Sequence, residues 1–408
     1  MKVGWVGLGK LGLPCALAIE SKGYEVLGYD VSPTVIEIVR KRKIPYREEG
    51  AQELLEKSHI HLTSLKDIVR ECELIFVAIQ TPHHEKYEGV TRLPDERVDF
   101  DYTYLIKGIE ALADEIAEQH VDRVVIIVST VLPTTIRTHI KPLLNEHVKL
   151  CYNPFFIAMG TCIRDLLNPE FNLFGVDDEE AARKAEAFYR TINNAPFYRT
   201  TVENAELIKV AYNTFIGMKI VFANTLMEIC HKTGCDVDVV TDGLKLATDR
   251  VISPKYLSGG LGDGGGCHPR DNIALSWLAR KLGLSYDWFE SVMNAREKQT
   301  EWLANLMDEY PLPKVILGKA FKPETNIIVG SPAILLKNIL EERGHSVIMY
   351  DPHVDMEKPN FKSSVFLIGT KHPEWIDFPF PQGSVVIDPW RYIPRREGVQ
   401  VIYVGGEN

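Results

Sequence analysis

The sequence predicts an α/β protein with a doubly wound parallel sheet at the N-terminus, a middle region of long helices and a smaller α/β part at the C-terminus. Short apolar runs alternate with amphipathic stretches over the first 200 residues and again after residue 310, and between them helical periodicity dominates. The length of 408 residues suits two or three domains. We therefore expect domains over residues 1–200, 201–310 and 311–408.

Composition and charge exclude several classes of protein. The chain has 46 Lys and Arg against 56 Asp and Glu, a net charge of −10, which argues against a nucleic-acid binder because such a protein needs a basic face. No run of 18 apolar residues is free of charge, so no membrane span is expected. The seven cysteines are spread along the chain and do not form a disulfide framework. No secretory segment precedes the first strand, and we expect a cytoplasmic protein.

The N-terminal part alternates expected strands with expected helices. Short runs rich in β-branched residues predict strands, and apolar residues three and four apart predict helices. The expected strands are Val3–Leu8, Glu25–Tyr29, Leu74–Ile79, Arg123–Ser129 and Lys149–Tyr152. The expected helices are Leu11–Lys22, Pro33–Arg40, Leu65–Glu71, Tyr102–Glu118 and Glu179–Thr191. This alternation is typical of a doubly wound parallel sheet.

The middle and C-terminal parts differ in character. Asn204–Thr233 predicts one long helix, which indicates a spine between domains or a dimer interface. A glycine-rich break, Ser258–Gly266, follows, and another helix is expected to begin near Asp271. Beyond Pro311-Leu312-Pro313, the expected elements are Lys314–Leu317, Pro332–Arg343, Ser346–Tyr350, Ser364–Ile368 and Ser384–Ile387.

The first strand leads into a dinucleotide fingerprint, Gly7-Leu8-Gly9-Lys10-Leu11-Gly12. Gly7 permits a tight turn, Gly9 lets the backbone approach a pyrophosphate, and Gly12 allows close packing of helix on strand. Asp30 ends the next strand, where an acid can bind both ribose hydroxyls and repel a 2′-phosphate, so the expected cofactor is NAD. A glycine-rich turn in an unrelated sheet is the alternative. We predict a Rossmann-type domain with NAD contacts at Gly7, Gly9, Leu11, Gly12 and Asp30.

Two polar segments follow expected strands at the edge where such sheets bind ligands: Thr81-Pro82 and Ser129-Thr130-Val131. Thr and Ser at these places also cap helices, and the residues alone do not separate the two interpretations. We include Thr81, Pro82, Ser129 and Thr130 among the expected cofactor contacts.

A thiol lies in a second glycine-rich segment, Gly264-Gly265-Gly266-Cys267-His268-Pro269-Arg270-Asp271. Glycines give a ligand access to the backbone, and a helix start with Arg270 beside it favours the nucleophilic thiolate. The alternative is that Cys267 is a small buried filler. Zinc binding is disfavoured because Cys267, His268 and the Cys230–Cys235 segment lack a second ligand pair, so no metal is expected.

Lys209 and Asn213 are four residues apart on the expected long helix and so share one face. A lysine there can extend its ammonium to solvent. Together with a thiol and a hydride acceptor, the ammonium and the amide instead indicate groups that stabilise an oxyanion.

These features together resemble the UDP-glucose/GDP-mannose dehydrogenase family of NAD-dependent nucleotide-sugar 6-dehydrogenases, over nearly the whole chain. Beyond the fingerprint and the thiol segment, further motifs match the family in order. They are Tyr152-Asn153-Pro154, Leu167-Asn168-Pro169, Ala205–Asn213, Ala320-Phe321-Lys322-Pro323, Ser331-Pro332 and Tyr350-Asp351-Pro352.

The resemblance implies a four-electron oxidation of a sugar C6 alcohol to a carboxylate with two NAD. It implies that Asp271 holds a water that helps to remove the hydroxyl proton, that Lys209 and Asn213 stabilise the alkoxide, and that Cys267 attacks the aldehyde to give a thiohemiacetal and then a thioester. Thr130 joins the predicted catalytic residues. It also implies a homodimer, with Arg250 reaching the neighbouring subunit's sugar site and Lys322 contacting the nucleotide sugar. The predicted substrate contacts are Lys209, Asn213, Arg250, Tyr256, Gly264 and Lys322.

The sequence departs from the family at several positions. Where the family usually reads Asn-Pro-Glu-Phe-Leu-Arg-Glu-Gly, this chain has Phe155, Ala158 and Met159 in place of the two acids and the arginine. The first acid is associated with positioning water for thioester hydrolysis, and a phenyl ring cannot relay a proton. Further departures are Val329, Asn326-Ile327, and Asp263 where an aromatic residue is common. The substrate can therefore differ from UDP-glucose.

Three alternatives stay open at this point. Oxidation by the same family chemistry can stop at the aldehyde. The chain can be a non-catalytic protein that binds NAD and a nucleotide, although such a protein has no use for an exposed thiol. A 2-hydroxy- or β-hydroxyacid dehydrogenase shares the fingerprint and a helix lysine but leaves Cys267 and the C-terminal α/β part unexplained.

Overall fold

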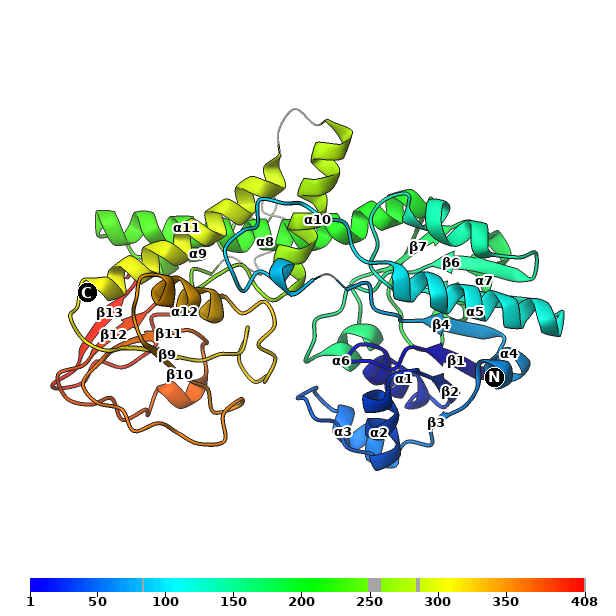
Figure 1. The fold of residues 1–408 in the computed structure, drawn as a ribbon, viewed down its shortest axis with the longest axis horizontal. Helices are drawn as coiled ribbons and strands as arrows, with labels where there is room; N and C mark the ends of the chain where they lie inside the picture. The colour runs from blue at the N-terminus through cyan, green and yellow to red at the C-terminus, as the bar shows by residue number, and fades with distance from the viewer. Residues whose placement is uncertain (83, 249–257, 284–286, 407–408) are drawn as a thin grey trace. The chain divides into compact units, whose positions relative to one another are not determined.

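The computed structural model describes residues 1–82, 84–248, 258–283 and 287–406 (Figure 1). The chain divides into two compact units: residues 1–82 with 100–211, and residues 83–99 with 212–408. The three-domain division of the sequence analysis stays a prediction. None of the helices within the described ranges is both long and apolar enough to cross a membrane.

Unit 1 is built on an eight-stranded sheet in the order β3-β2-β1-β4-β5-β6-β7-β8. Its pairings are parallel except for the antiparallel pair β6–β7. The strands are β1 (Lys2–Val6), β2 (Glu25–Tyr29), β3 (His61–Leu62), β4 (Leu74–Val77), β5 (Arg123–Ile127), β6 (Val148–Tyr152), β7 (Asn172–Val176) and β8 (Phe197–Thr200). The helices are α1 (Gly12–Glu20), α2 (Pro33–Lys41), α3 (Ala51–Lys57), α4 (Leu65–Glu71), α5 (Thr103–Gln119), α6 (Cys162–Leu167) and α7 (Glu179–Tyr189).

Of the central strands, β4 is buried along its whole length and β5 at every residue but the first, as expected for parallel strands covered by helices on both faces. The predicted fold class is confirmed. The strand β2 and the helix α4 have the predicted bounds, and the other predicted elements of unit 1 are displaced by one to a few residues at their ends. The predicted long helix is α8 (Val202–Thr233), whose N-terminal part belongs to unit 1 and whose remainder belongs to unit 2.

Unit 2 contains the remaining α-helices and a five-stranded parallel sheet in the order β10-β9-β11-β12-β13. The helices are α9 (Val237–Lys245), α10 (Cys267–Leu282), α11 (Trp288–Asp308) and α12 (Pro332–Glu342). The strands are β9 (Lys314–Leu317), β10 (Val347–Tyr350), β11 (Val365–Ile368), β12 (Val385–Asp388) and β13 (Gln400–Tyr403). The helix expected to begin near Asp271 is α10, and it begins four residues earlier, at Cys267.

The two sheets start in the same way. In unit 1 the Gly7 N–H donates to Tyr29 O and the Leu8 N–H to Asp30 Oδ2, at 2.9 and 2.7 Å. In unit 2 the Gly318 N–H donates to Tyr350 O and the Lys319 N–H to Asp351 Oδ2, at 2.7 and 2.6 Å. Each sheet therefore closes its first strand–helix turn onto a Tyr-Asp pair that ends the neighbouring strand.

Candidate active site

The fingerprint turn of unit 1 has the geometry that its glycines predict. Gly7 has a φ of +91°, in the left-handed region that favours glycine. A Cβ on Gly12 would lie 2.0 Å from Gly7 O, so only glycine permits this approach of α1 to the turn. A Cβ on Gly9 would meet no atom within 4 Å, so the space beside Gly9 is open. The turn thus leaves open the side on which a pyrophosphate would approach.

Asp30 and the start of α1 complete the expected cofactor site. The two carboxylate oxygens of Asp30 accept N–H groups from Leu8 and Ser32, each at 2.7 Å, and the residue stays half-exposed. Helix α1 begins after Leu11 with no side-chain cap and no acid in its first turn, so its N–H groups can bind an anion. Leu11 itself packs against the core of unit 1. These residues fit NAD: open N–H groups for the phosphates and a fixed carboxylate for ribose.

The hydroxyls of Thr81 and Ser129 neither cap helices nor stand free at the sheet edge. Thr81 Oγ1 donates to Thr130 O at 2.8 Å, and Ser129 Oγ donates to Ile79 O at 2.6 Å. Both side chains are buried. They join the loops that follow β4 and β5, which leaves Pro82 and Thr130, both half-buried, as the more accessible members of this edge.

Lys209 is buried, with 6% of its surface exposed, and does not extend to solvent. Its ammonium lies 5.4 Å from the centre of the Phe156 ring, within the range of a cation–π contact. Phe156 also packs on Phe171, with ring centroids 4.8 Å apart. The preceding Phe155 instead lies in the hydrophobic core of unit 1. Nothing in the sequence singled out Phe156, because adjacent identical residues do not show which one turns toward the lysine.

Glu206 is a buried acid that the sequence analysis also missed. It lies one turn before Lys209 on α8, and its carboxylate oxygens accept the N–H groups of Thr134 and Ile136 at 2.6 and 2.8 Å. Burial raises the pKa of Glu206 to about 7, although the two N–H groups oppose the rise. Thr134 has a φ of +78°, which is strained for a β-branched residue. Glu206 therefore holds a strained turn in the loop that also contains Thr130.

In unit 2, Cys267 is the first residue of α10 and is exposed. The interpretation as a buried filler is therefore wrong for this thiol; among the seven cysteines only Cys235 is also exposed. The helix start has no side-chain cap, so its N–H groups are directed at the region of the sulfur.

Asp271 lies one turn after Cys267 on α10 and is fully buried. Asn213 Nδ2 donates to Asp271 Oδ2 at 2.5 Å, and Arg270 Nε donates to Asp271 Oδ1 at 2.9 Å. The carboxylate is thus oriented from both sides, and one N–H of the Asn213 amide is committed to it. Asn213 and Asp271 are thus joined by a hydrogen bond, and Cys267 precedes Asp271 by one turn of α10, whereas Lys209 belongs to unit 1.

Of the other predicted substrate residues, the structure describes Gly264 and Lys322. Gly264 precedes the thiol with a φ of +112°, and the His268 ring lies 2.8 Å from where its Cβ would be. Lys322 is half-buried, with its ammonium 5.6 Å from the Phe321 ring. Arg250 and Tyr256 lie outside the described residues.

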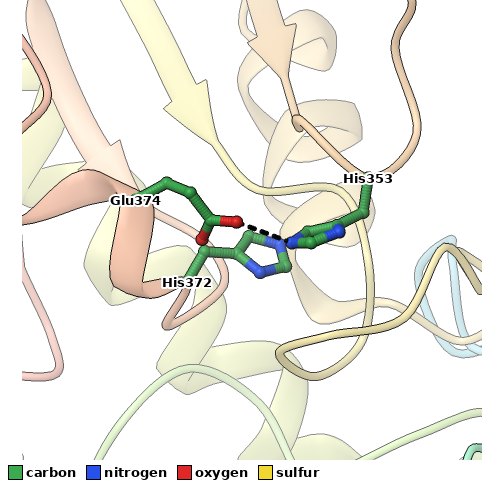
Figure 2. Close-up of side chains that lie close together, drawn as sticks. All are labelled: His353, His372 and Glu374. Carbon is green, nitrogen blue, oxygen red and sulfur yellow. Dashed lines mark ion pairs between the residues drawn. The ribbon is translucent and has the colours of Figure 1, made fainter. Parts of the chain in front are cut away.

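Figure 2 shows His353, His372 and Glu374, whose potential ligand atoms lie within 4.8 Å of one another in unit 2. His353 Nε2 pairs with Glu374 Oε1 at 3.0 Å, and His372 Nε2 pairs with the fully buried Asp351 at 3.1 Å. Burial raises the pKa of Asp351, but hydrogen bonds from His372 and from the N–H groups of Ala320, Lys319 and His353 hold it well below its usual range. These pairs account for the cluster, and the expectation of no metal stays a prediction.

Two profiles of one protein family match long parts of the chain. The profile of the UDP-glucose/GDP-mannose dehydrogenase family, NAD binding domain, matches residues 1–193, and the profile of the same family's central domain matches residues 203–298. The chain belongs to the UDP-glucose/GDP-mannose dehydrogenase family. It is an NAD-dependent nucleotide-sugar dehydrogenase, as the fingerprint and the thiol loop predict.

Relatives cover most of the chain. The UDP-glucose 6-dehydrogenase TuaD of Bacillus subtilis is 30% identical over 367 residues, which span 86% of this chain and 76% of TuaD. The GDP-mannose 6-dehydrogenase of Pseudomonas aeruginosa is 29% identical over 87% of this chain and 82% of its own. The solved structure of a UDP-glucose dehydrogenase from Pyrobaculum islandicum matches with a TM-score of 0.87 and 25% identity, over 100% of this chain and 98% of that one.

Proposed function

We propose that this dehydrogenase oxidises the C6 primary alcohol of a nucleotide-linked sugar to the carboxylate through a covalent intermediate on Cys267. The observation that carries the proposal is the group on α8 and α10: an exposed thiol at a helix start, one turn from a buried carboxylate that Asn213 and Arg270 orient. The relatives that act on UDP-glucose and GDP-mannose support a nucleotide sugar as the substrate class.

Each residue has a role that its surroundings support. The Lys209 ammonium and the Asn213 amide stabilise the alkoxide that forms as the C6 hydroxyl loses its proton. Asp271 orders the water that accepts this proton. Gly7–Gly12 and Asp30 would hold NAD, which when bound would accept a hydride in each of the two oxidations.

After the first oxidation the Cys267 sulfur attacks the C6 aldehyde, and the oxygen gains a proton to give a thiohemiacetal. The second oxidation removes the C6 hydrogen as hydride and the hydroxyl proton, leaving a thioester. Water then attacks the thioester carbon, the C–S bond breaks, and the acid and the free thiol are released. Gly264 and Lys322, together with Arg250 and Tyr256, contact the nucleotide sugar in this proposal.

The test is acid and NADH formation over a panel of UDP-, GDP- and CMP-linked sugars, followed by mass spectrometry of the product. Cys267→Ser is expected to lower acid formation by about 10³-fold, since a hydroxyl is a far weaker nucleophile. Cys235→Ser, which alters the other exposed cysteine, is the matched control and retains wild-type turnover. Wild-type protein that binds NAD but turns over no nucleotide sugar would refute the proposal.

One observation favours a different end point, in which the reaction stops at the aldehyde or at the thioester. The position that matches the family's first acid is Phe155, and its ring lies in the core of unit 1, so it offers no group that could position water. Aldehyde release, or a thioester that accumulates on Cys267, is the signature of this version. Free acid that appears at half the rate of NADH formation from the first turnover would exclude it.

A further inference from the structure

The glycine loop, residues 258–266, lies against the C-terminal part of unit 2. A Cβ on Gly260, Gly262 or Gly265 would lie 2.1 Å from Trp390, 2.3 Å from Pro332 and 2.7 Å from Phe321, respectively. Glycine is therefore needed in this loop for packing, whatever a ligand requires. A loop so poor in side chains has few groups with which to hold its own conformation, and it leads directly into Cys267.

Asp263 is the charged residue of the glycine loop, and it is completely buried. Its Oδ1 accepts a hydrogen bond from Arg296 Nε of α11 at 2.7 Å, and Arg296 is only 2% exposed. Within the described residues, Asp263 Oδ2 has no hydrogen-bond partner. Such a pair is weak as a source of stability, because desolvation offsets most of the attraction. A geometric role accounts for it better than a stabilising one.

Arg296 also bonds a second segment, which packs against the residues that follow the thiol. Its Nη2 donates to Gly89 O at 2.7 Å. A Cβ on Gly89 would lie 2.5 Å from the Pro269 ring, so this segment packs directly on the residue two positions after Cys267. One guanidinium therefore fixes the loop four residues before the thiol and the segment that supports the turn after it.

We propose that Asp263 and Arg296 are positioning residues that set the direction of the Cys267 sulfur. This proposal rests on the proposed function, in which that sulfur attacks the C6 aldehyde. The pair acts on the segments before and after Cys267, so its loss is expected to slow the aldehyde-to-acid step and to leave the alcohol-to-aldehyde step near its wild-type rate. Asp263 stands where the family usually has an aromatic residue, so the device belongs to this chain's own sequence.

The decisive experiment uses the double variant Asp263→Leu with Arg296→Met. It removes both charges of the pair, so that neither is left buried without its partner. We expect the kcat for acid formation from a nucleotide-linked 6-aldehyde to fall about 10-fold, with KM within about 2-fold of wild type, since small displacements of a reacting atom are costly. Iodoacetamide alkylation of Cys267, followed by peptide mass spectrometry, should change at least about 3-fold, while that of Cys235 stays constant.

Arg92→Met is the matched control. Arg92 joins the same segment to Glu297 and Glu301 of α11 but does not contact the glycine loop, so the variant should behave as wild type. Asp263→Asn, which keeps an oxygen for Arg296, should restore most of the alkylation rate. Arg296→Lys keeps the charge beside Asp263 but lacks the forked guanidinium that also bonds Gly89 O, and it serves as the test if the double variant does not fold. Wild-type alkylation and wild-type aldehyde oxidation in the double variant, or in Arg296→Lys, would overturn the proposal. A shifted alkylation rate in a protein that oxidises no nucleotide sugar would instead refute only the proposed function.

Discussion

At the scale of single residues, Glu206 shows how burial changes a titration. Its pKa of about 7 means that the folded chain holds a proton on Glu206 between about pH 4.5 and 7, where the unfolded chain has lost it. The folded state binds more protons in this window, so its stability falls as the pH rises through it.

Glu206→Gln is expected to remove this pH dependence. Between pH 5 and pH 8, the wild type should lose on the order of 1–3 kcal/mol of unfolding free energy relative to the variant, measured by urea denaturation. Glu203→Gln, three residues earlier on α8 and paired at the surface with Arg137, is the control and should follow the wild type. Parallel pH profiles for the wild type and Glu206→Gln would contradict the assignment.

At the scale of elements, the β1–α1 turn separates cofactor binding from folding. Gly9→Ala places a methyl group in open space and outside the left-handed region, so thermal unfolding should stay within about 0.5 kcal/mol of wild type. The same methyl group blocks the approach of the pyrophosphate, so the Kd for NAD, measured by calorimetry, should rise at least about 10-fold.

Gly12→Ala is the matched change three residues along the same turn. Its Cβ would lie 2.0 Å from Gly7 O and 2.8 Å from the Trp5 indole nitrogen, so we expect a loss of about 1–3 kcal/mol in stability. An Ala at position 9 that binds NAD as tightly as glycine would contradict the assigned cofactor site.

The elements also show how far the sequence leads. Period and composition predicted β2, α4 and β9 with their observed bounds, because each is a compact apolar or amphipathic run between turns. The short helices α3 and α6 were missed because neither has a side-chain cap at its start, whereas α4, of similar length, is capped by Ser64. The motif residues of the site were predicted from the sequence. The residues that hold the surrounding loops in place by hydrogen bonds were not. Glu206 and Arg296 act through contacts with residues about 70 and 33 positions away, and no local pattern encodes these.

At the scale of the whole molecule, the predicted homodimer has support from exposed aromatic residues on the long helix. Phe215 and Phe222 are seven residues apart on one face of α8 and are 41% and 50% exposed. We propose that a second copy of the chain covers this face, since large apolar side chains in a row at the surface mark an interface.

Phe222→Glu should convert the protein from twice the 46.2 kDa chain mass to a monomer in light scattering. A charge buried in an apolar interface without a partner is strongly unfavourable. Tyr104→Glu, an equally exposed aromatic residue on α5, should leave the mass unchanged. A wild-type protein that elutes as a monomer at micromolar concentration would contradict the dimer.

The similar first turns of the two sheets have a consequence for crystals soaked with adenine dinucleotides. Both sheets present a glycine turn bonded to a Tyr-Asp pair, yet Asp30 is partly exposed, while Asp351 is fully buried and hydrogen-bonded to the His372 ring. Electron density for a ribose should appear at the first turn and never at its twin.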